Sequence, residues 1–472
     1  MLNPPPPCAF LLNNIGPAGL CACALLQERN CDFLLIDAGR SIHERSRHDP
    51  LQCAEGVGGA GLFSDGKFSF YPSSSALWQL PDRPLLQRSY QRVVRDLQEY
   101  GLGGADGLPS FPTTAIEKKK ESTGEERREE GKGEEWELKR YPSFYMSLED
   151  RLRLTQRYAD GLPALLETKV MDVTFKRRNG TDKEEEAEDL VCCKVVVQRR
   201  QREQPHKTKV SAESSSSEEE EEEEHDEKED GEEVQLLYCK RLIFGGGRFG
   251  PLLFPKQESV FRRMEVGVRV QDRSHNPFFS RIKLLDPKYK LTIPSSSFFH
   301  SSHSSVDGRT EEEATTIEWR TFCCCREGEV VEAGPGGFFS GRSDCPPTGL
   351  SNIGFNLRCC SEKDALLCGQ KLGNDFQGPL LRFLAEREDC FVAVGLRKLC
   401  DSFPELLTES SQVIGPTMEG VGFYPELEEG GGLRSLWIVG DSSGVFRGIV
   451  AAMVSGYYVA QEVLETLSKK MH

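Results

Sequence analysis

The chain has 472 residues, a formal net charge of -16 at pH 7, 28% charged residues and 38% hydrophobic residues. That length exceeds what one ordinary hydrophobic core supports, so we expect two domains. Basic stripes interleaved with aromatic residues are not present, which argues against a nucleic-acid surface. No apolar run reaches the ~18 residues of a membrane helix, which argues against a transmembrane segment.

Three low-complexity segments interrupt the chain. Residues 111–140 are rich in Lys, Glu and Arg, residues 205–233 are strongly acidic, and residues 295–313 are rich in Ser and His. The stretch Ser211–Glu233 alone has fourteen acidic residues and one lysine, so the rest of the chain is close to neutral. Because these segments lack the apolar residues that offset chain entropy, we predict disordered surface inserts, and we predict no metal site at His300 and His303.

The 17 cysteines include adjacent residues, and these make poor disulfide partners. A reduced compartment is the simpler interpretation. The amino terminus has no basic region ahead of an apolar one, so no secretory signal is expected. We therefore expect a cytoplasmic protein, with a plastid location as the alternative.

The chain is organised around residues 8–37. An apolar strand (Cys8–Leu12) leads into a glycine turn (Asn14–Gly19), a helix, a second strand (Phe33–Ile36) and Asp37. The turn occupies the position of a G-x-G-x-x-G fingerprint with Asn14 in place of the first glycine, and Asn tolerates the left-handed backbone required there. The strands, the helix and the acid together predict a dinucleotide-binding βαβ unit, in which Asp37 hydrogen-bonds a ribose. A generic α/β crossover with a glycine turn is the alternative. The candidate nucleotide contacts here are Asn14, Gly16, Pro17, Ala18, Gly19, Asp37, Ala38 and Arg40.

A second glycine-rich loop follows, with candidate ligand contacts at Gly58, Gly59, Ala60 and Gly61. Such glycine density favours close backbone approach to a ligand. Next come predicted helices at Pro84–Tyr100 and Ser147–Leu166, then a β-meander made of Lys169–Arg177, Leu190–Arg199 and Val234–Tyr238.

A strand at Arg241–Phe244 runs into Gly245-Gly246-Gly247-Arg248-Phe249-Gly250, a formal second match to G-x-G-x-x-G. Two prolines among the next five residues prevent a long helix from starting there. We therefore interpret the segment as a turn that returns the chain to the first nucleotide, with Gly246 as a contact.

The carboxyl-terminal part is again regular. A strand at Leu436–Val439 ends in Gly440-Asp441, and a helix is predicted from Ile449 to Leu467. Ala452, Gly456 and Ala460 give this helix a small-residue face suited to close packing on a sheet or a cofactor.

These pieces resemble the FAD flavoproteins with two dinucleotide-binding folds. More narrowly, GVGGAGLFSDGKFS, IEWRTFCCCREGEVVEAG and GDSSGVFRGIVAAMVSG are similar to the uncharacterised "FAD-dependent dehydrogenase" (NAD/FAD-utilising dehydrogenase) family. The resemblance runs from Cys8 to about Gln461 outside the inserts, and Asn14 departs from the family pattern. It implies FAD contacts at Gly440 and Asp441, and the amino terminus of the last helix (Gly448, Ile449) aimed at the flavin ring.

The resemblance implies an α/β protein: a discontinuous Rossmann-like FAD-binding domain with an inserted mixed α+β substrate domain. We predict the FAD-binding domain at 1–110, 141–250 and 405–472, and the substrate domain at 251–404. The first strand should be central in the parallel sheet.

The expected function is an FAD-dependent oxidoreductase that transfers a hydride through a non-covalently bound flavin, with a small-molecule substrate and with NAD(P)H as a candidate electron donor. The alternatives are a geranylgeranyl-reductase-like enzyme for an unsaturated lipid-like substrate and a flavin-binding protein without turnover. Lys67 and Arg447 are the candidate catalytic charges. For Cys323 and Cys325, a structural role is favoured over a redox pair. The sequence leaves the substrate and the oligomeric state open.

Overall fold

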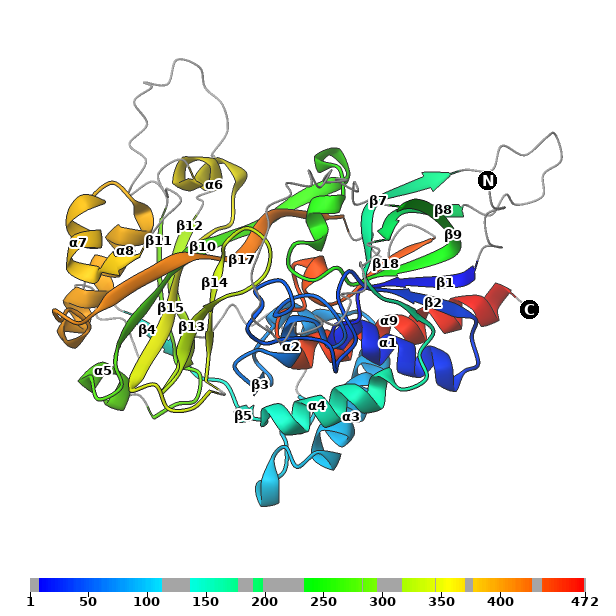
Figure 1. Ribbon diagram of the computed structural model, residues 1–472, viewed down its shortest axis with the longest axis horizontal. Coiled ribbons are helices and arrows are strands. Elements are labelled where there is room, and N and C mark those ends of the chain that lie inside the picture. Colours follow the sequence, from blue (N-terminus) through cyan, green and yellow to red (C-terminus); the bar gives the residue numbers. More distant parts are fainter. Residues whose placement is uncertain are drawn as a thin grey trace, which may run out of the picture.

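The computed structural model describes residues 8–112, 136–176, 190–197, 233–281, 283–294, 316–343, 345–369, 377–426 and 435–470. Two large sheets form its framework, one on each side of Figure 1. The three predicted inserts lie almost entirely outside the described residues. Among the helices that are described, none combines the length and the apolar character needed to cross a bilayer.

The first sheet has the strand order β6-β2-β1-β9-β8-β7, with β18 also paired to β9. Its parallel part consists of β1 (Cys8–Asn13), β2 (Phe33–Ile36), β6 (Ala164–Leu165), β9 (Glu233–Phe244) and β18 (Leu436–Ile438). Strand β1 lies between β2 and β9 and is parallel to both, while β18 is parallel to β9. The prediction of a central first strand is thereby confirmed, and the carboxyl ends of β1, β2, β9 and β18 lie at one edge of the sheet.

The β-meander predicted from the sequence is also present. Strand β7 (Thr168–Lys176) pairs antiparallel with β8 (Leu190–Val197), and β8 pairs antiparallel with β9. One detail of the prediction was wrong, because Val234–Tyr238 and Arg241–Phe244 form one continuous strand. The first half of β9 bonds to β8 and its last residues bond to β18, so one long strand serves both parts of the sheet.

Helices cover one face of this sheet and the meander covers the other. Alternation along β1 explains the division, because Phe10 and Leu12 join the core beneath the helices while Leu11 joins the core beneath the meander. The helices are α1 (Pro17–Glu28), α3 (Arg83–Glu99), α4 (Leu148–Ala159) and α9 (Ile449–Lys470). Beside them lie α2 (Gly59–Leu62) and a two-stranded ribbon of β3 (Lys67–Ser69) and β5 (Ser143–Tyr145).

The small-residue face of α9 packs on helix α1. A Cβ on Gly456 would lie 2.1 Å from the Ala18 carbonyl oxygen, so only glycine permits this approach. The predicted close packing therefore occurs between two helices, and it brings the start of α1 next to α9.

The second sheet is antiparallel, with the order β16-β17-β10-β15-β12-β11-β4. Its strands are β4 (Glu137–Lys139), β10 (Ser259–Arg273), β11 (Lys288–Pro294), β12 (Thr316–Cys325), β15 (Leu350–Cys359), β16 (Gly378–Pro379) and β17 (Gln412–Pro425). Helices α7 (Leu380–Glu386) and α8 (Phe391–Ser402) pack on its apolar face (Figure 1). Helices α5 (Pro277–Arg281) and α6 (Glu362–Gly369) and a hairpin of β13 (Glu329–Glu332) and β14 (Phe339–Arg342) complete this part.

Alternation gives the second sheet two chemically different faces. Val268 and Val270 of β10 join the apolar core, whereas Glu265 and Arg269 of the same strand belong to a polar set on the other face. Strand β12 repeats the pattern, with Trp319 in the core and Arg320 paired to Glu265.

Two strands of this second sheet fall outside the predicted substrate segment 251–404. Strand β17 comes from 405–472, which the sequence assigned to the FAD-binding domain, and β4 comes from the end of the charged insert 111–140. Strand β17 pairs with β10 over most of its length, and this ladder of backbone hydrogen bonds decides its place. The domain boundaries themselves stay predictions.

Candidate functional site

The turn after β1 has the conformation that a dinucleotide fingerprint requires. Asn14 is left-handed (φ 78°), and its Oδ1 accepts a 2.8 Å hydrogen bond from the Gly16 N–H. A Cβ on Gly19 would lie 2.2 Å from the Asn14 carbonyl oxygen, so glycine is required for α1 to pack against the turn. Helix α1 has no side-chain cap and no acidic residue in its first turn, which leaves its amino-terminal N–H groups suited to an anion.

The second glycine-rich loop lies directly against this turn. The Gly58 N–H donates a 2.7 Å hydrogen bond to the Ile15 carbonyl, and a Cβ on Gly59 would come within 2.9 Å of the Gly16 Cα. Gly58 and Gly59 both have positive φ, 91° and 54°. Two loops separated by about forty residues in the sequence therefore meet backbone to backbone, which glycine permits. The predicted approach of this loop to a ligand stays a prediction.

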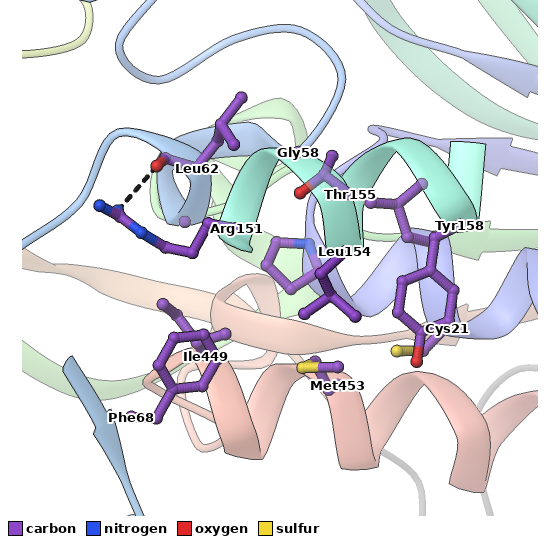
Figure 2. Close-up of a pocket in the computed structure, with 13 residues that line it drawn as sticks. Cys21, Gly58, Leu62, Phe68, Arg151, Leu154, Thr155, Tyr158, Ile449 and Met453 are labelled. Carbon is purple, nitrogen blue, oxygen red and sulfur yellow. Dashed lines mark hydrogen bonds between the residues drawn. The ribbon is translucent and has the colours of Figure 1, made fainter. Parts of the chain in front are cut away.

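Two buried arginines shape the second loop, and sequence reasoning did not find either. Arg45 donates to the Val57 carbonyl at 2.6 Å and to the Gly59 carbonyl at 3.0 Å. Arg151 on α4 donates to the carbonyls of Leu62 (2.7 Å) and Ser64 (2.9 Å), as Figure 2 shows for Leu62. For Arg151 a signal existed, because it interrupts the apolar side of a helix that also presents Leu154. Arg45 lies in a polar loop that carries no comparable signal.

Asp37 ends β2 as predicted, but its carboxylate already has other partners. Its Oδ2 accepts from the Ile15 N–H at 2.7 Å, and its Oδ1 accepts from Gly39 at 2.8 Å and from Gly56 at 2.7 Å. The residue is 1% exposed. Burial raises the pKa of Asp37, and the three backbone N–H groups oppose that rise. In this structure Asp37 ties three loops together, and its hydrogen bond to a ribose stays a prediction.

Ala38 and Arg40 follow Asp37 in the same crowded corner. The Arg40 carbonyl accepts a 3.0 Å hydrogen bond from the Val57 N–H, and its guanidinium lies 3.7 Å from Glu167. Arg40 therefore supports the second glycine loop through its backbone, while its half-buried side chain forms an ion pair.

The turn after β18 reaches the same edge of the sheet. Gly440 is left-handed (φ 63°), and a Cβ there would lie 3.1 Å from the Ala18 Cβ. The neighbouring Ser442 hydroxyl donates a 3.0 Å hydrogen bond to the Gly247 carbonyl, in the turn after β9 that also contains Gly246. The prediction that GGGRFG is a turn and not the start of a long helix is confirmed, because only a 3₁₀ turn (Gly250–Leu253) follows it. The Gly245 N–H donates to the Asn13 carbonyl at 2.9 Å, and the predicted contact of Gly246 with a nucleotide stays a prediction.

A small, mainly apolar cavity, partly open to solvent, lies beside α1 (Figure 2). Four of the predicted FAD contacts border it: Pro17, Gly58, Gly61 and Ile449. The other lining residues are Leu20, Cys21, Leu62, Phe68, Arg151, Leu154, Thr155, Tyr158 and Met453. Ala60 lies within α2 beside this cavity, and Gly448 precedes Ile449 with φ 95° and open space where a Cβ would be.

The two predicted catalytic charges both have ionic partners. The Lys67 ammonium lies 3.0 Å from Asp65 and donates to the Cys324 carbonyl of the second sheet. Arg447 donates a 2.9 Å hydrogen bond to Glu265 and pairs with Glu419. Each charge therefore links the part of the molecule built on the first sheet to the second sheet, and neither borders the cavity of Figure 2.

Glu265 is the centre of an arginine cluster on the polar face of the second sheet. It is 0% exposed and lies 2.5 Å from Arg320, 2.9 Å from Arg447, 3.2 Å from Arg263 and 3.5 Å from Arg358. Burial alone would raise the pKa of Glu265, but the four guanidinium groups lower it. Asp441 lies at the rim of this cluster, 3.9 Å from Arg248 and from Arg263. The sequence analysis did not find the cluster, because its members come from four distant segments.

Comparison with known proteins adds little beyond this geometry. Neither a protein-family model nor a curated protein matches the chain. Similar solved structures include a flavoprotein/dehydrogenase from Cytophaga hutchinsonii (10% identity, 98% of this chain and 79% of that one, TM-score 0.40). A second is a geranylgeranyl bacteriochlorophyll reductase-like protein from Thermoplasma acidophilum (13% identity, 98% of this chain and 79% of that one, TM-score 0.36). A third is p-nitrophenol 4-monooxygenase from Pseudomonas putida (10% identity, 98% of this chain and 81% of that one, TM-score 0.36). At such low overlap, no statement about activity rests on these similarities.

Proposed function

We propose that the protein is an FAD-dependent oxidoreductase. The observation that carries the proposal is the meeting of four loops at the carboxyl edge of the parallel strands β1, β2, β9 and β18. Ligands of doubly wound sheets bind in the crevice at this edge. Here the edge presents a glycine turn, an uncapped helix amino terminus and a second glycine loop in contact with the first.

The donor set fits the diphosphate of FAD better than a neutral ligand. The N–H groups at the start of α1 point out of a helix end that no side chain caps, and no carboxylate lies in that first turn. The loops approach each other so closely at Gly16 and Gly59 that a side chain at either position would crowd its neighbours. Asn14, Gly16, Pro17, Ala18 and Gly19 would hold the phosphates, and the loop Gly58–Gly61 would cover them.

The remaining residues of the site would orient the rest of the cofactor. Gly440 and Asp441 would face the ribityl chain, and the amino-terminal end of α9 at Gly448 and Ile449 would face the ring. When bound, the flavin would supply hydride transfer, and NAD(P)H is the proposed electron donor. Asp37 would act indirectly, by setting the positions of Ile15, Gly39 and Gly56.

The first test is the cofactor content of the purified full-length chain. We expect a yellow protein that releases FAD, and not FMN, on denaturation, because the fingerprint turn serves an adenosine diphosphate group. Anaerobic mixing with NADH or NADPH should then bleach the flavin. A colourless protein that does not bind added FAD would overturn the proposal, and bound FAD that no donor reduces would favour the flavin-binding protein without turnover.

Asn14 offers a sharper test of the site. Its side-chain oxygen accepts the hydrogen bond of the Gly16 N–H, which would otherwise be able to donate to a phosphate. Asn14→Gly frees this donor and removes the left-handed strain, so we expect FAD affinity to stay equal or to rise by up to roughly tenfold. Asp has a side chain of the same size and shape as Asn. Asn14→Asp should weaken FAD binding, because it places a negative charge beside the phosphates. Both are measured by fluorescence titration of apoprotein with FAD, and tighter binding by the Asp variant would contradict the placement.

A further inference from the structure

Two cysteine thiols that the proposed function does not use lie in contact in the Cys323–Cys325 segment, at the end of β12. The two Sγ atoms are 3.6 Å apart, within contact distance of each other. Cys323 is left-handed (φ 46°), and β12 has a bulge between Phe322 and Cys325 in its ladder with β15. A non-glycine residue in this conformation costs free energy, and such strain concentrates at functional sites. The bulge brings together two thiols that the C-x-C spacing alone would not.

Charged groups from two other strands surround the pair. The Cys323 sulfur and Asp65 Oδ2 lie 2.9 Å apart, and Asp65 in turn pairs with Lys67 at 3.0 Å. From β10, the Arg269 guanidinium lies 3.8 Å from the Cys325 sulfur and donates to the Cys323 carbonyl at 2.6 Å. Arg269 is itself fixed by a 2.8 Å hydrogen bond to Asn352. Two fixed cations beside one sulfur favour its thiolate form.

We propose that Cys323 and Cys325 are a reversible dithiol–disulfide pair, in which Cys325 is the reactive thiolate and Cys323 the resolving thiol. Cys325 is 0% exposed and Cys323 is only partly buried. A hydroperoxide therefore has to reach the Cys325 sulfur from the side of the more exposed Cys323. A larger thiol reductant meets the outer sulfur of Cys323 first, and its attack there releases Cys325 as the leaving thiolate.

The electrostatics of the site agree with these roles. The hydrogen bond from Cys323 lowers the pKa of Cys325 to about 6, with Lys67 and Arg269 adding to the effect against the opposing effect of burial. The pKa of Cys323 is raised by that same hydrogen bond and by burial. Asp65 opposes thiolate formation at Cys325, and Asp286 contributes negative charge near Lys67.

The oxidation step balances with one hydroperoxide. The Cys325 thiolate attacks the O–O bond and becomes a sulfenic acid, while the leaving oxygen departs as water or an alcohol. The Cys323 sulfur then attacks the sulfenic sulfur, the S–S bond forms and a water leaves. Two thiols and one hydroperoxide yield one disulfide, and the two thiol protons end on the two oxygen products.

A metal ion is the competing occupant, because Asp65, Cys323 and Cys325 place three ligand atoms within 4.8 Å of one another. The Lys67 ammonium lies 3.0 Å from Asp65 and the Arg269 guanidinium lies 3.8 Å from the Cys325 sulfur, and both would repel a cation. The geometry therefore favours thiol chemistry over metal binding.

The test uses the full-length chain, reduced, freed of reductant and treated with stoichiometric hydrogen peroxide before alkylation and trypsin digestion. We expect the peptide Thr321–Arg326 to lose two hydrogen atoms and to regain them after dithiothreitol. Cys324→Ser should preserve this disulfide, Cys325→Ser should abolish it, and Cys323→Ser should leave a sulfenic acid at Cys325 that dimedone traps. The pair Cys359 and Cys368 is the internal control and should stay reduced, because both thiols are buried and the pKa of Cys359 is raised by its hydrogen bond to Cys368 and by burial.

Lys67→Met should slow oxidation several-fold at pH 7, because one of the two cations that favour the Cys325 thiolate is lost and the thiolate fraction falls, and Lys67→Arg should restore most of the rate. The proposal is overturned if the wild-type peptide stays fully reduced, if Cys324→Ser abolishes the disulfide, or if the purified protein contains stoichiometric zinc whose removal alone exposes the thiols. None of these readouts depends on flavin content, so this proposal and the proposed function fail separately.

Discussion

Asp37 and Glu265 are both buried carboxylates, 1% and 0% exposed, and the chain compensates them in opposite ways. Asp37 sits among three neutral backbone N–H groups and has a raised pKa, whereas Glu265 sits among four guanidinium groups and has a lowered one. Backbone dipoles offset part of the cost of burying a charge, and several opposite charges reverse that cost. Asp37 consequently organises loops, while Glu265 neutralises arginines that join the second sheet to the turn before α9.

Of the substitutions that test this comparison, we expect Glu265→Gln to change the free energy of unfolding most. Glu265→Gln leaves four guanidinium groups around a neutral amide, so we expect a loss of about 3–5 kcal/mol in the free energy of unfolding. The measurement is denaturant unfolding of the full-length variant. Glu386→Gln removes the acid of an exposed pair with Arg382 and should cost no more than ~0.5 kcal/mol. Equal effects at the two sites would show that the cluster contributes no more than a surface ion pair.

A smaller effect is expected at Asp37. Asp37→Asn replaces one acceptor oxygen by an amide that faces backbone donors, so at least one of its three hydrogen bonds is lost, at a cost of about 1–3 kcal/mol. Because the affected loops border the proposed nucleotide site, FAD affinity should fall together with stability. The exposed Asp32, at the entry to the same strand, gives Asp32→Asn as the matched control. If Asp37→Asn weakened FAD binding without any loss of stability, a direct ribose contact would be the better explanation.

The pH dependence of the two variants should have opposite signs. Glu265 has a lowered folded pKa, so its contribution to stability is present above its unfolded value of ~4.3 and is lost as the pH falls through the folded value. Asp37 has a raised folded pKa, so its contribution is present below its unfolded value and is lost as the pH rises through the folded value. In melting temperatures between pH 3 and pH 7, the deficit of Glu265→Gln should widen as the pH rises, and that of Asp37→Asn should narrow. Deficits that move in the same direction would contradict the contrast.

Local patterns predicted the first sheet well because its signals are close in sequence. Alternating and continuous apolar runs predicted β1, β2 and the meander, and the glycines of the first turn predicted a left-handed residue at Asn14 and close packing at Gly19. Each of these features depends on steric limits within a few residues, so no tertiary information is needed.

Which groups a side chain or strand bonds to, in contrast, depended on the tertiary structure. The sequence places an acid at position 37, but only the approach of Gly39 and Gly56 decides that its carboxylate accepts hydrogen bonds from the backbone. Likewise β17 joins the second sheet because β10 offers it a ladder of hydrogen bonds, which no pattern within β17 reveals.

The two C-x-C segments also show the difference between what local sequence predicts and what the tertiary structure decides. Cys21 and Cys23 have the spacing of Cys323 and Cys325, yet the first two lie on helix α1, where residues two apart point to different sides. A strand places residues two apart on one face, and the bulge at Cys323 brings the two sulfur atoms to 3.6 Å. The sequence by itself determined most strands of the first sheet, the turn geometry after β1 and the spacing of the cysteines, because these follow from local sterics and periodicity. The tertiary structure alone decided which charges face Asp37, Glu265 and Cys325, because those partners come from strands far apart in the chain.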